Sequence, residues 1–156
     1  MSNMSNIIDN IYVLRNNIFI LTPILISFYK NLQPQDNDLL LSYFVFPLVL
    51  NPSFLEQIQI IPCSSSLERI TKNKEIMAGF EERFYFYRDI TNKCIQYALE
   101  CHAIKIEDNL SVSVTKRNIF HTDAEFTKSI NLSSQLYKIF TRDVLNTYYA
   151  FGIKRI

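Results

Sequence analysis

The apolar run at residues 39–50 constrains the fold most, because it contains a proline at position 47. A central strand cannot accept this proline, which would remove a donor from the hydrogen-bond ladder. A membrane span needs about 20 apolar residues, and the polar stretch KNLQPQDND separates this run from an earlier one at residues 17–29. Both runs therefore predict buried helices and no membrane segment, the second helix being kinked or ended at Pro47.

The composition predicts one domain over residues 1–156, with a flexible start at about residues 1–10. The 48% of hydrophobic and 20% of charged residues are typical of a globular protein with a real core. The opening MSNMSNIIDN lacks the basic start of a secretory signal, so we expect a cytoplasmic protein. Two glycines, far apart, exclude a glycine-rich loop that cradles a nucleotide, and we predict no cofactor.

Helical periodicity covers most of the chain. The two apolar runs predict helices from residue 17 and from about residue 39, each begun by a capping side chain. A short helix follows from Pro52, and a long amphipathic helix covers residues 79–102. The candidate caps are Asn16 or Asn17 for the first helix and Asp36, Asn37 or Asp38 for the second.

The period changes at residues 103–115, where AIKIEDNLSVSVT alternates apolar and polar side chains. This pattern predicts a β-hairpin, with Asp108 and Asn109 supplying the left-handed backbone of its turn. A C-terminal helix is predicted over 123–149, and the ending FGIKRI is a candidate final strand. The predicted fold class is mainly α with a small β-hairpin, in the order of a winged-helix-like domain with a long C-terminal helix.

Basic side chains gather toward the C-terminus. Residues 105–156 carry 8 basic and 5 acidic side chains, which is less than the basic stripe of an autonomous nucleic-acid binder. In a winged helix, basic residues on and after the hairpin would touch phosphates without reading sequence. On a strand edge they would instead keep that edge soluble. The candidate phosphate or partner contacts are Lys105, Lys116, Arg117, Lys154 and Arg155.

No grouping of residues predicts catalysis or metal binding. Glu81 and Glu82 are adjacent, so on a helix they point about 100° apart and cannot form a carboxylate pair. No serine lies in a glycine-flanked nucleophile turn. The three cysteines predict reduced thiols, and with His102 and His121 they match neither a zinc finger nor a cysteine–histidine pair. We therefore predict that the protein is not an enzyme and has no catalytic, cofactor-binding or metal-binding residue.

Aromatic residues are in excess, with 12 phenylalanines and 9 tyrosines. The stretch FYFY at 84–87 spans a full helical turn, so its rings point in every direction around the helix. One small domain cannot easily bury all of them, and such side chains are favoured anchors of protein interfaces. The composition therefore favours a protein partner.

Three stretches, taken in order, resemble a known family. They are FPLVLN at 46–51, the start GF.ER of the long helix and the ending FGIKR at 151–155. Over roughly residues 10–155 the chain resembles the small middle component of bacterial three-component ABC systems, which include Lamassu-type anti-phage systems. The helix start consists of Gly79, Phe80, Glu82 and Arg83.

The resemblance implies a non-catalytic accessory subunit in anti-phage or anti-plasmid defence. Its expected partners are an SMC-like, coiled-coil ABC ATPase, on which it docks, and a nuclease-type effector, which it helps to hold or release. DNA would be reached through the complex. Two alternatives stay open at this point: a free-standing winged-helix DNA-binding regulator, and a small enzyme that works through His102 or His121.

Overall fold

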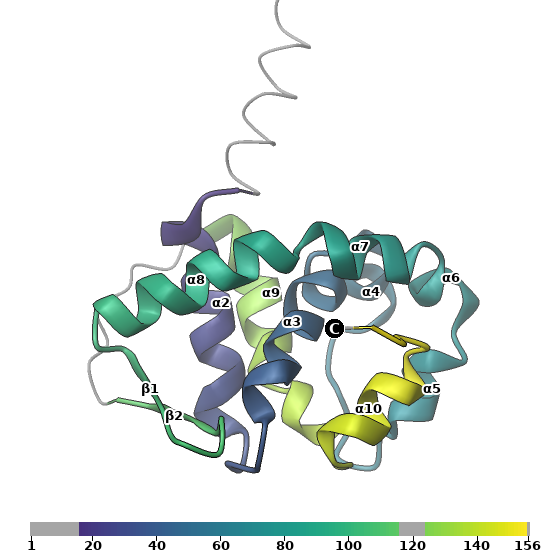
Figure 1. Cartoon of the computed structure of the whole chain (residues 1–156). Helices are drawn as coiled ribbons and strands as arrows, with labels where there is room; N and C mark the ends of the chain where they lie inside the picture. The colour runs from purple at the N-terminus through teal and green to yellow at the C-terminus, as the bar shows by residue number, and fades with distance from the viewer. Residues whose placement is uncertain (1–15, 116–123, 156) are drawn as a thin grey trace, which may run out of the picture.

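The computed structural model describes residues 16–115 and 124–155 (Figure 1). The fold is mainly helical with a small antiparallel hairpin, as predicted, and within these ranges no helix is long and apolar enough to span a membrane. In chain order the elements are α2 (Ile18–Asn31), η1 (Asp38–Leu41), α3 (Ser42–Val49), α4 (Pro52–Gln57), α5 (Leu67–Thr71), α6 (Lys74–Met77), α7 (Phe80–Phe86), α8 (Arg88–Glu100), β1 (Ile104–Ile106), β2 (Val112–Val114), η2 (Ala124–Phe126), α9 (Thr127–Ser133), η3 (Leu136–Lys138) and α10 (Val144–Ala150).

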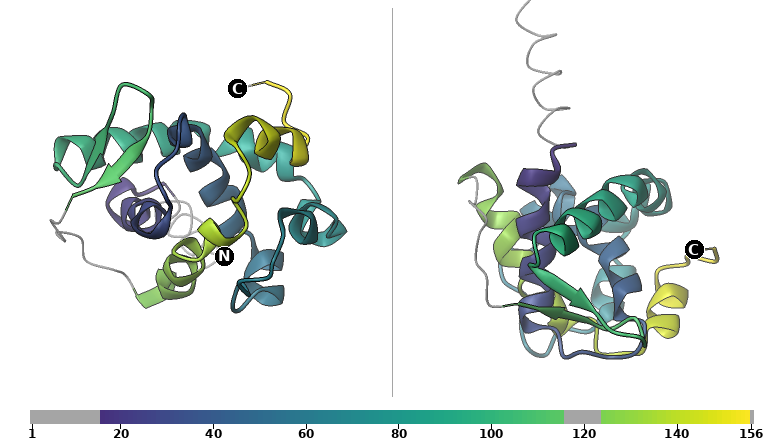
Figure 2. Two further views of the ribbon diagram at one scale, coloured as in Figure 1. Left: turned by 90° about the horizontal axis from the view of Figure 1, so that it is seen from below. Right: turned by 60° about the vertical axis from the view of Figure 1, so that its left-hand side comes forward.

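The apolar helices α2 and α3 form the centre of the fold, and other elements enclose them (Figures 1 and 2). Helix α2 packs against α8 and α9, whereas α3 packs against α7 and α9. The Asn17 side chain caps α2 by accepting a hydrogen bond from the Phe19 amide at 2.9 Å. The predicted start of the first helix is therefore confirmed.

Helix α3 continues past Pro47 and ends at Val49. Proline lacks an amide hydrogen, but here only the last turn of the helix loses a bond. The Leu50 amide still donates to the Phe46 carbonyl at 3.1 Å. The Asn51 side chain then caps α4 by accepting from the Ser53 amide at 3.2 Å. The chain thus passes from a buried helix into the predicted Pro52 helix within two residues.

The sequence predicted that Asp36, Asn37 or Asp38 caps the second helix, but Asp38 does not cap it. A 3₁₀ turn, η1, precedes α3, and no side chain caps its start. The buried Asp38 carboxylate instead accepts from the amide of Gln35 at 3.0 Å and from that of Val112 at 2.8 Å. The prediction was wrong because the carboxylate turns toward the hairpin, whose amide needs an acceptor.

The helix predicted over 79–102 is divided at Tyr87 into α7 and α8. The Tyr87 carbonyl accepts both the amide (3.0 Å) and the hydroxyl (2.8 Å) of Thr91. Such back-bonding by threonine bends helices. After Glu100 the chain leaves the helix through His102, which has a φ of 55°, and the Ala103 amide donates to the Ala98 carbonyl at 2.8 Å. This is the pattern of a helix closed by a left-handed residue.

The predicted hairpin is present, with Ile104 opposite Val114 and Ile106 opposite Val112. Its left-handed residue is Leu110, with a φ of 60°, and not Asp108 or Asn109 as expected. The loop at residues 37–39, before α3, holds this turn through two backbone hydrogen bonds. The amide of Asn37 donates to the carbonyl of Asn109, and the amide of Leu39 donates to that of Leu110. A non-glycine residue keeps such a conformation where its surroundings fix it.

The long C-terminal helix predicted over 123–149 is helical only in parts. It consists of η2, α9, η3 and α10, with residues 139–143 outside any helix. The Ser133 hydroxyl donates to the Ile24 carbonyl of α2, and the Asp143 side chain begins α10 by accepting from the Asn146 amide. Ser, Thr and Asp side chains offer the backbone partners that compete with a continuous helix. The candidate strand at 151–156 is also absent from the described residues 151–155.

An aromatic cluster around Phe44 joins segments that are far apart in the sequence. The Phe44 ring centroid lies 5.2 Å from that of Phe84 in α7 and 4.7 Å from those of Tyr148 in α10 and Phe151 after it. These buried rings belong to one continuous hydrophobic core. The C-terminal segment is therefore held against α3 and α7.

Candidate functional site

Two of the three stretches that carry the family resemblance, FPLVLN and GF.ER, meet at α6. The Ile76 carbonyl accepts from the Asn51 amide group at 3.2 Å and from the Arg83 guanidinium at 2.7 Å. The same guanidinium donates to the carbonyl of Ala78 and, at 3.4 Å, to that of Pro47. Partial burial lowers the pKa of Arg83. We call Arg83 and these three carbonyls the arginine clasp, which joins FPLVLN to GF.ER.

The ending FGIKR joins the same structure through a ring stack. Phe80 and Phe151 lie with their ring centroids 4.8 Å apart and nearly parallel, at 21°. Two glycines with left-handed backbone, Gly79 (φ 63°) and Gly152 (φ 74°), bring the rings together. A side chain is strained in that region of backbone space, so glycine suits both turns. The end of the chain consequently runs beside α7.

A surface pocket of about 590 Å³ lies where the end of the chain crosses α7 and α8. The Tyr85 hydroxyl donates to the Arg155 carbonyl at 3.1 Å, and the buried Ile153 donates its amide to the Tyr148 carbonyl at 3.1 Å. These two bonds fix the main chain on both sides of Lys154. We call it the tail pocket, and its lining consists of Glu81, Tyr85, Arg88, Lys154 and Arg155.

The tail pocket is lined by three cations and one carboxylate. Within residues 16–115 and 124–155, ion pairs join Lys105 to Glu107 and Arg142 to Glu68, and none involves Arg88 or the two cations of the tail. The side chains of Arg88, Lys154 and Arg155 are exposed. The pocket therefore presents positive charge that no described carboxylate neutralises by a direct ion pair.

Two tyrosines lie beside this pocket as neutral hydrogen-bond donors. The Tyr43 hydroxyl donates to the Asn92 side chain at 2.7 Å, and that of Tyr148 to the Leu40 carbonyl at 2.8 Å. Burial raises the pKa of Tyr43, an effect that the Arg88 charge partly opposes. Burial also raises the pKa of Tyr148, and the nearby tyrosines add to it. Burial thus favours the neutral, hydrogen-bond-donating form of both hydroxyls.

The structure separates the residues that were predicted as phosphate or partner contacts. Lys154 and Arg155 meet in the tail pocket. Lys105 lies on the hairpin, at the left of the molecule in Figure 1 and away from the tail, and its ammonium pairs with Glu107 at 2.9 Å, which raises the pKa of Lys105. Lys116 and Arg117 lie outside the described residues. The three candidates within the described residues thus do not form one surface.

The pocket also contains residues that were not singled out as a site. Glu81, Tyr85 and Arg88 line it together with the tail. They follow one another at steps of four and three residues, which places them on one face of a helical segment. That spacing was available in the sequence, but the crossing of this face by residues 153–155 was not.

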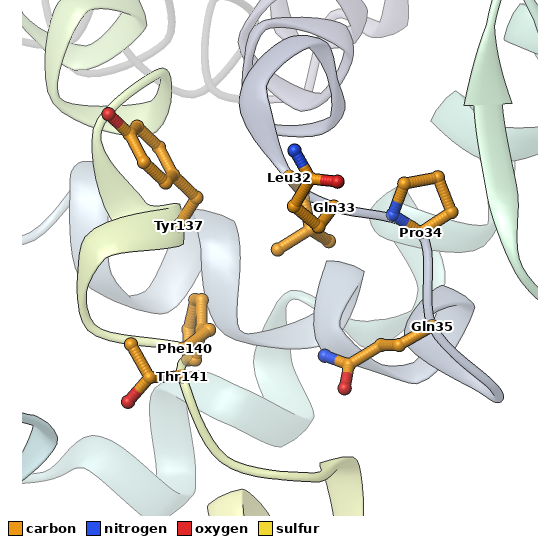
Figure 3. A pocket seen from close by; sticks show the side chains of 7 residues that line it. All are labelled: Leu32, Gln33, Pro34, Gln35, Tyr137, Phe140 and Thr141. Carbon is orange, nitrogen blue, oxygen red and sulfur yellow. The ribbon is translucent and has the colours of Figure 1, made fainter.

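A second pocket, of about 360 Å³, lies between the end of α2 and the segment after η3 (Figure 3). Its side chains are neutral, and Leu32 and Phe140 are buried. None of the predicted phosphate or partner contacts lines this pocket, and neither does a carboxylate, imidazole, amine or thiol. Figure 3 shows the lining from two sides, with Leu32, Gln33, Pro34 and Gln35 on one and Tyr137, Phe140 and Thr141 on the other.

The described residues contain no metal-binding cluster. No group of three His, Cys, Asp or Glu side chains in this part of the chain is placed to hold a metal ion. His102 is exposed at the end of α8, and His121 lies outside the described residues. Burial raises the pKa of the Cys94 thiol to about 11, the reverse of what an activated nucleophile needs.

Comparison with known proteins identifies one family. The model of the family described as ABC-three component (ABC-3C) system Middle Component 3 matches residues 5–155. No curated protein and no solved structure gives a match. The family match covers the three stretches that meet at the arginine clasp and the tail pocket.

Proposed function

The chain belongs to the ABC-three component system Middle Component 3 family, and on that premise we propose that it is an accessory subunit of an SMC-like ATPase complex in bacterial defence. A middle component works with other proteins in a multi-component ABC system. The proposed partners are a coiled-coil ABC ATPase and a nuclease-type effector. The subunit docks on the ATPase and holds or releases the effector, in the manner of Lamassu-type systems directed against phages or plasmids.

The observation that carries this proposal is the family match over residues 5–155. The surface supports it, because large aromatic side chains remain exposed on the elements beside the tail pocket. Phe86 on α7 is 63% exposed and Tyr149 on α10 is 67% exposed. Aromatic residues of this kind anchor protein interfaces. We propose that the subunit acts in the cytoplasm as one domain without catalytic chemistry of its own, and that the ATPase supplies nucleotide hydrolysis.

The free-standing winged-helix regulator stays the second hypothesis. Its candidate wing is the hairpin, where Lys105 is already paired with Glu107 and the turn is bonded to the 37–39 loop. These contacts favour a hairpin that packs on its own protein. Salt-sensitive binding of the isolated chain to duplex DNA, weakened by Lys116→Ala with Arg117→Ala, would favour the regulator instead.

Co-expression with the neighbouring genes tests the proposed function. The chain should co-elute in size-exclusion chromatography with the coiled-coil ATPase encoded beside it, and it should not co-elute with a coiled-coil ATPase from an unrelated system. Deleting its gene should remove protection against phage or plasmid while leaving the ATPase expressed. Elution of the chain alone and monomeric, in the presence of its own ATPase, would contradict the proposal.

A further inference from the structure

We propose that the tail pocket is the docking site for an acidic segment of the ABC ATPase. The inference rests on the proposed function, since it gives the chemistry of the surface that this partner presents. It starts from three exposed cations, Arg88, Lys154 and Arg155, which two different elements bring to one pocket. No described carboxylate forms an ion pair with any of them.

Carboxylates are the natural complement of this pocket. An arginine guanidinium binds a carboxylate through two parallel hydrogen bonds, and the pocket offers two such groups and one lysine. The pocket's volume of about 590 Å³ accommodates several side chains, so a segment rather than a single residue fits it. Glu81, at the same surface, accepts a hydrogen bond from an amide or a basic side chain of that segment. The expected partner sequence is therefore acidic with at least one donor.

The main chain of the pocket is already ordered. Helices α7 and α8 fix Tyr85 and Arg88, and the end of the chain is fixed by the buried Ile153 and by the bond from the Tyr85 hydroxyl to the Arg155 carbonyl. Binding at a preformed site costs little backbone ordering, so more of the interaction energy appears as affinity. Only the ends of the long basic side chains must still be ordered.

The charge pattern favours a protein segment over nucleic acid. A duplex is bound by a stripe of basic side chains that follows its phosphates. Here Glu81 lies in the pocket, and the exposed Glu82 and Asp89 follow on the same two helices. These carboxylates would repel a long phosphate backbone, whereas a short acidic segment pairs with the three cations and needs only one donor to face Glu81. Tyrosine and arginine at one surface are also typical of protein interfaces.

Charge reversal tests the docking site. The variant Arg88→Glu, Lys154→Glu, Arg155→Glu should weaken the Kd for the purified ATPase, measured by biolayer interferometry, by at least about 10-fold. A matched control, Arg69→Glu, Lys72→Glu, Lys74→Glu, makes the same charge change at exposed positions on and near α5 and α6. It should bind like the unmodified chain. The double variant Arg88→Lys, Arg155→Lys keeps the charge and should lose less than the reversal.

Each outcome of this experiment decides between the proposals. Equal binding by the reversal variant and the unmodified chain overturns the docking site and leaves the proposed function intact. Failure of the unmodified chain to bind the ATPase overturns the proposed function, and the docking site falls with it. If reversal instead abolishes binding of a 20-base-pair duplex and leaves ATPase binding unchanged, the pocket belongs to nucleic acid. Should the triple variant melt at a lower temperature than the control, Arg155→Glu alone should still show a smaller loss in the same direction.

Discussion

Two regions of the molecule each use a buried or half-buried charged side chain to join distant segments. On the side of the tail, Arg83 donates to three carbonyls in two segments, that of Pro47 in α3 and those of Ile76 and Ala78 at the end of α6. On the side of the hairpin, Asp38 accepts from the amide of Gln35 in the preceding loop and from that of Val112 in β2. The regions differ in what surrounds these groups. Near the hairpin the exposed Lys105 has a partner in Glu107, whereas the cations of the tail pocket form no ion pair with a described carboxylate.

The difference indicates which side of the molecule has charged side chains without an ion-pair partner in the described part of its own chain. The hairpin pairs Lys105 with Glu107 and bonds its turn to the 37–39 loop, so these polar groups serve the fold. On the tail side, Arg83 stabilises the fold, and Arg88, Lys154 and Arg155 add exposed positive charge at the tail pocket. This contrast is the reason for proposing partner binding on the tail side, and the following substitutions test whether the two regions differ in this way.

Removing the arginine clasp should have the largest effect on stability. Arg83→Ala leaves the carbonyls of Ile76, Ala78 and Pro47 without this donor, and we expect a loss of about 2–4 kcal/mol in the free energy of unfolding. Urea denaturation measures this change. Arg83→Lys should lose less, because an ammonium retains the charge but not the planar set of donors. An Arg83→Ala protein as stable as the unmodified chain would contradict the role of the clasp.

Removing the carboxylate on the hairpin side should cost somewhat less. Asp38→Ala leaves the amides of Gln35 and Val112 without an acceptor, and the expected loss is about 2–3 kcal/mol. The matched substitution is Asp36→Ala in the same loop, where the exposed carboxylate accepts from the Asn109 side chain. It should leave the urea midpoint nearly unchanged. Equal effects of the two substitutions would show that the position of Asp38 has no special importance.

The third prediction, with a smaller expected effect, is that Asp38 on the hairpin side makes the stability of the protein depend on pH. Burial raises the pKa of Asp38, so the folded protein binds this proton more tightly than the unfolded chain does. The contribution of that proton to stability is complete below the ordinary carboxyl pKa and is lost as the pH rises through the raised value. Urea midpoints of the unmodified chain should therefore fall over this interval relative to those of Asp38→Asn. Parallel pH curves would contradict this linkage.

The smallest effect should come from the tail. Tyr85→Phe removes the hydrogen bond from the hydroxyl to the Arg155 carbonyl and keeps the ring, so we expect a loss of about 0.5–1 kcal/mol or less. Because this bond orders the pocket, ATPase binding should weaken even where stability barely changes. Tyr137→Phe is the control, since Tyr137 lines the second pocket, away from the tail (Figure 3). Equal loss of binding in both variants would argue against an ordered tail.

The elements that the sequence predicted well are those whose ends are decided within a few residues. Asn17 and Asn51 cap helices that begin directly after them, and the alternation at residues 103–115 gives the hairpin. The C-terminal helix was overextended because its apolar spacing continues across residues 139–143, where the chain leaves the helix. Periodicity reports which side chains are buried, and it does not report where the backbone turns between them.

The site was predicted only in part, because it depends on contacts between distant segments. Lys154 and Arg155 were named from their charge, but the crossing of α7 by the tail is fixed by the Phe80–Phe151 stack and by Ile153. Arg83 was identified by resemblance, and its bond to the Pro47 carbonyl, 36 positions earlier, has no local signal. Hydrogen bonds of this kind depend on the tertiary fold, so the local sequence does not predict them.

The bond from the Val112 amide to Asp38 makes one exchangeable hydrogen a reporter for the whole hairpin. This amide points away from the opposite strand and donates at 2.8 Å to a carboxylate 74 positions earlier. Protection of this amide against exchange with deuterium therefore requires the hairpin to pack on the 37–39 loop. Pairing of the two strands alone does not protect it. Closing so long a segment is slow compared with forming a local hairpin, so in refolding this amide should gain its protection after the neighbouring strand amides do.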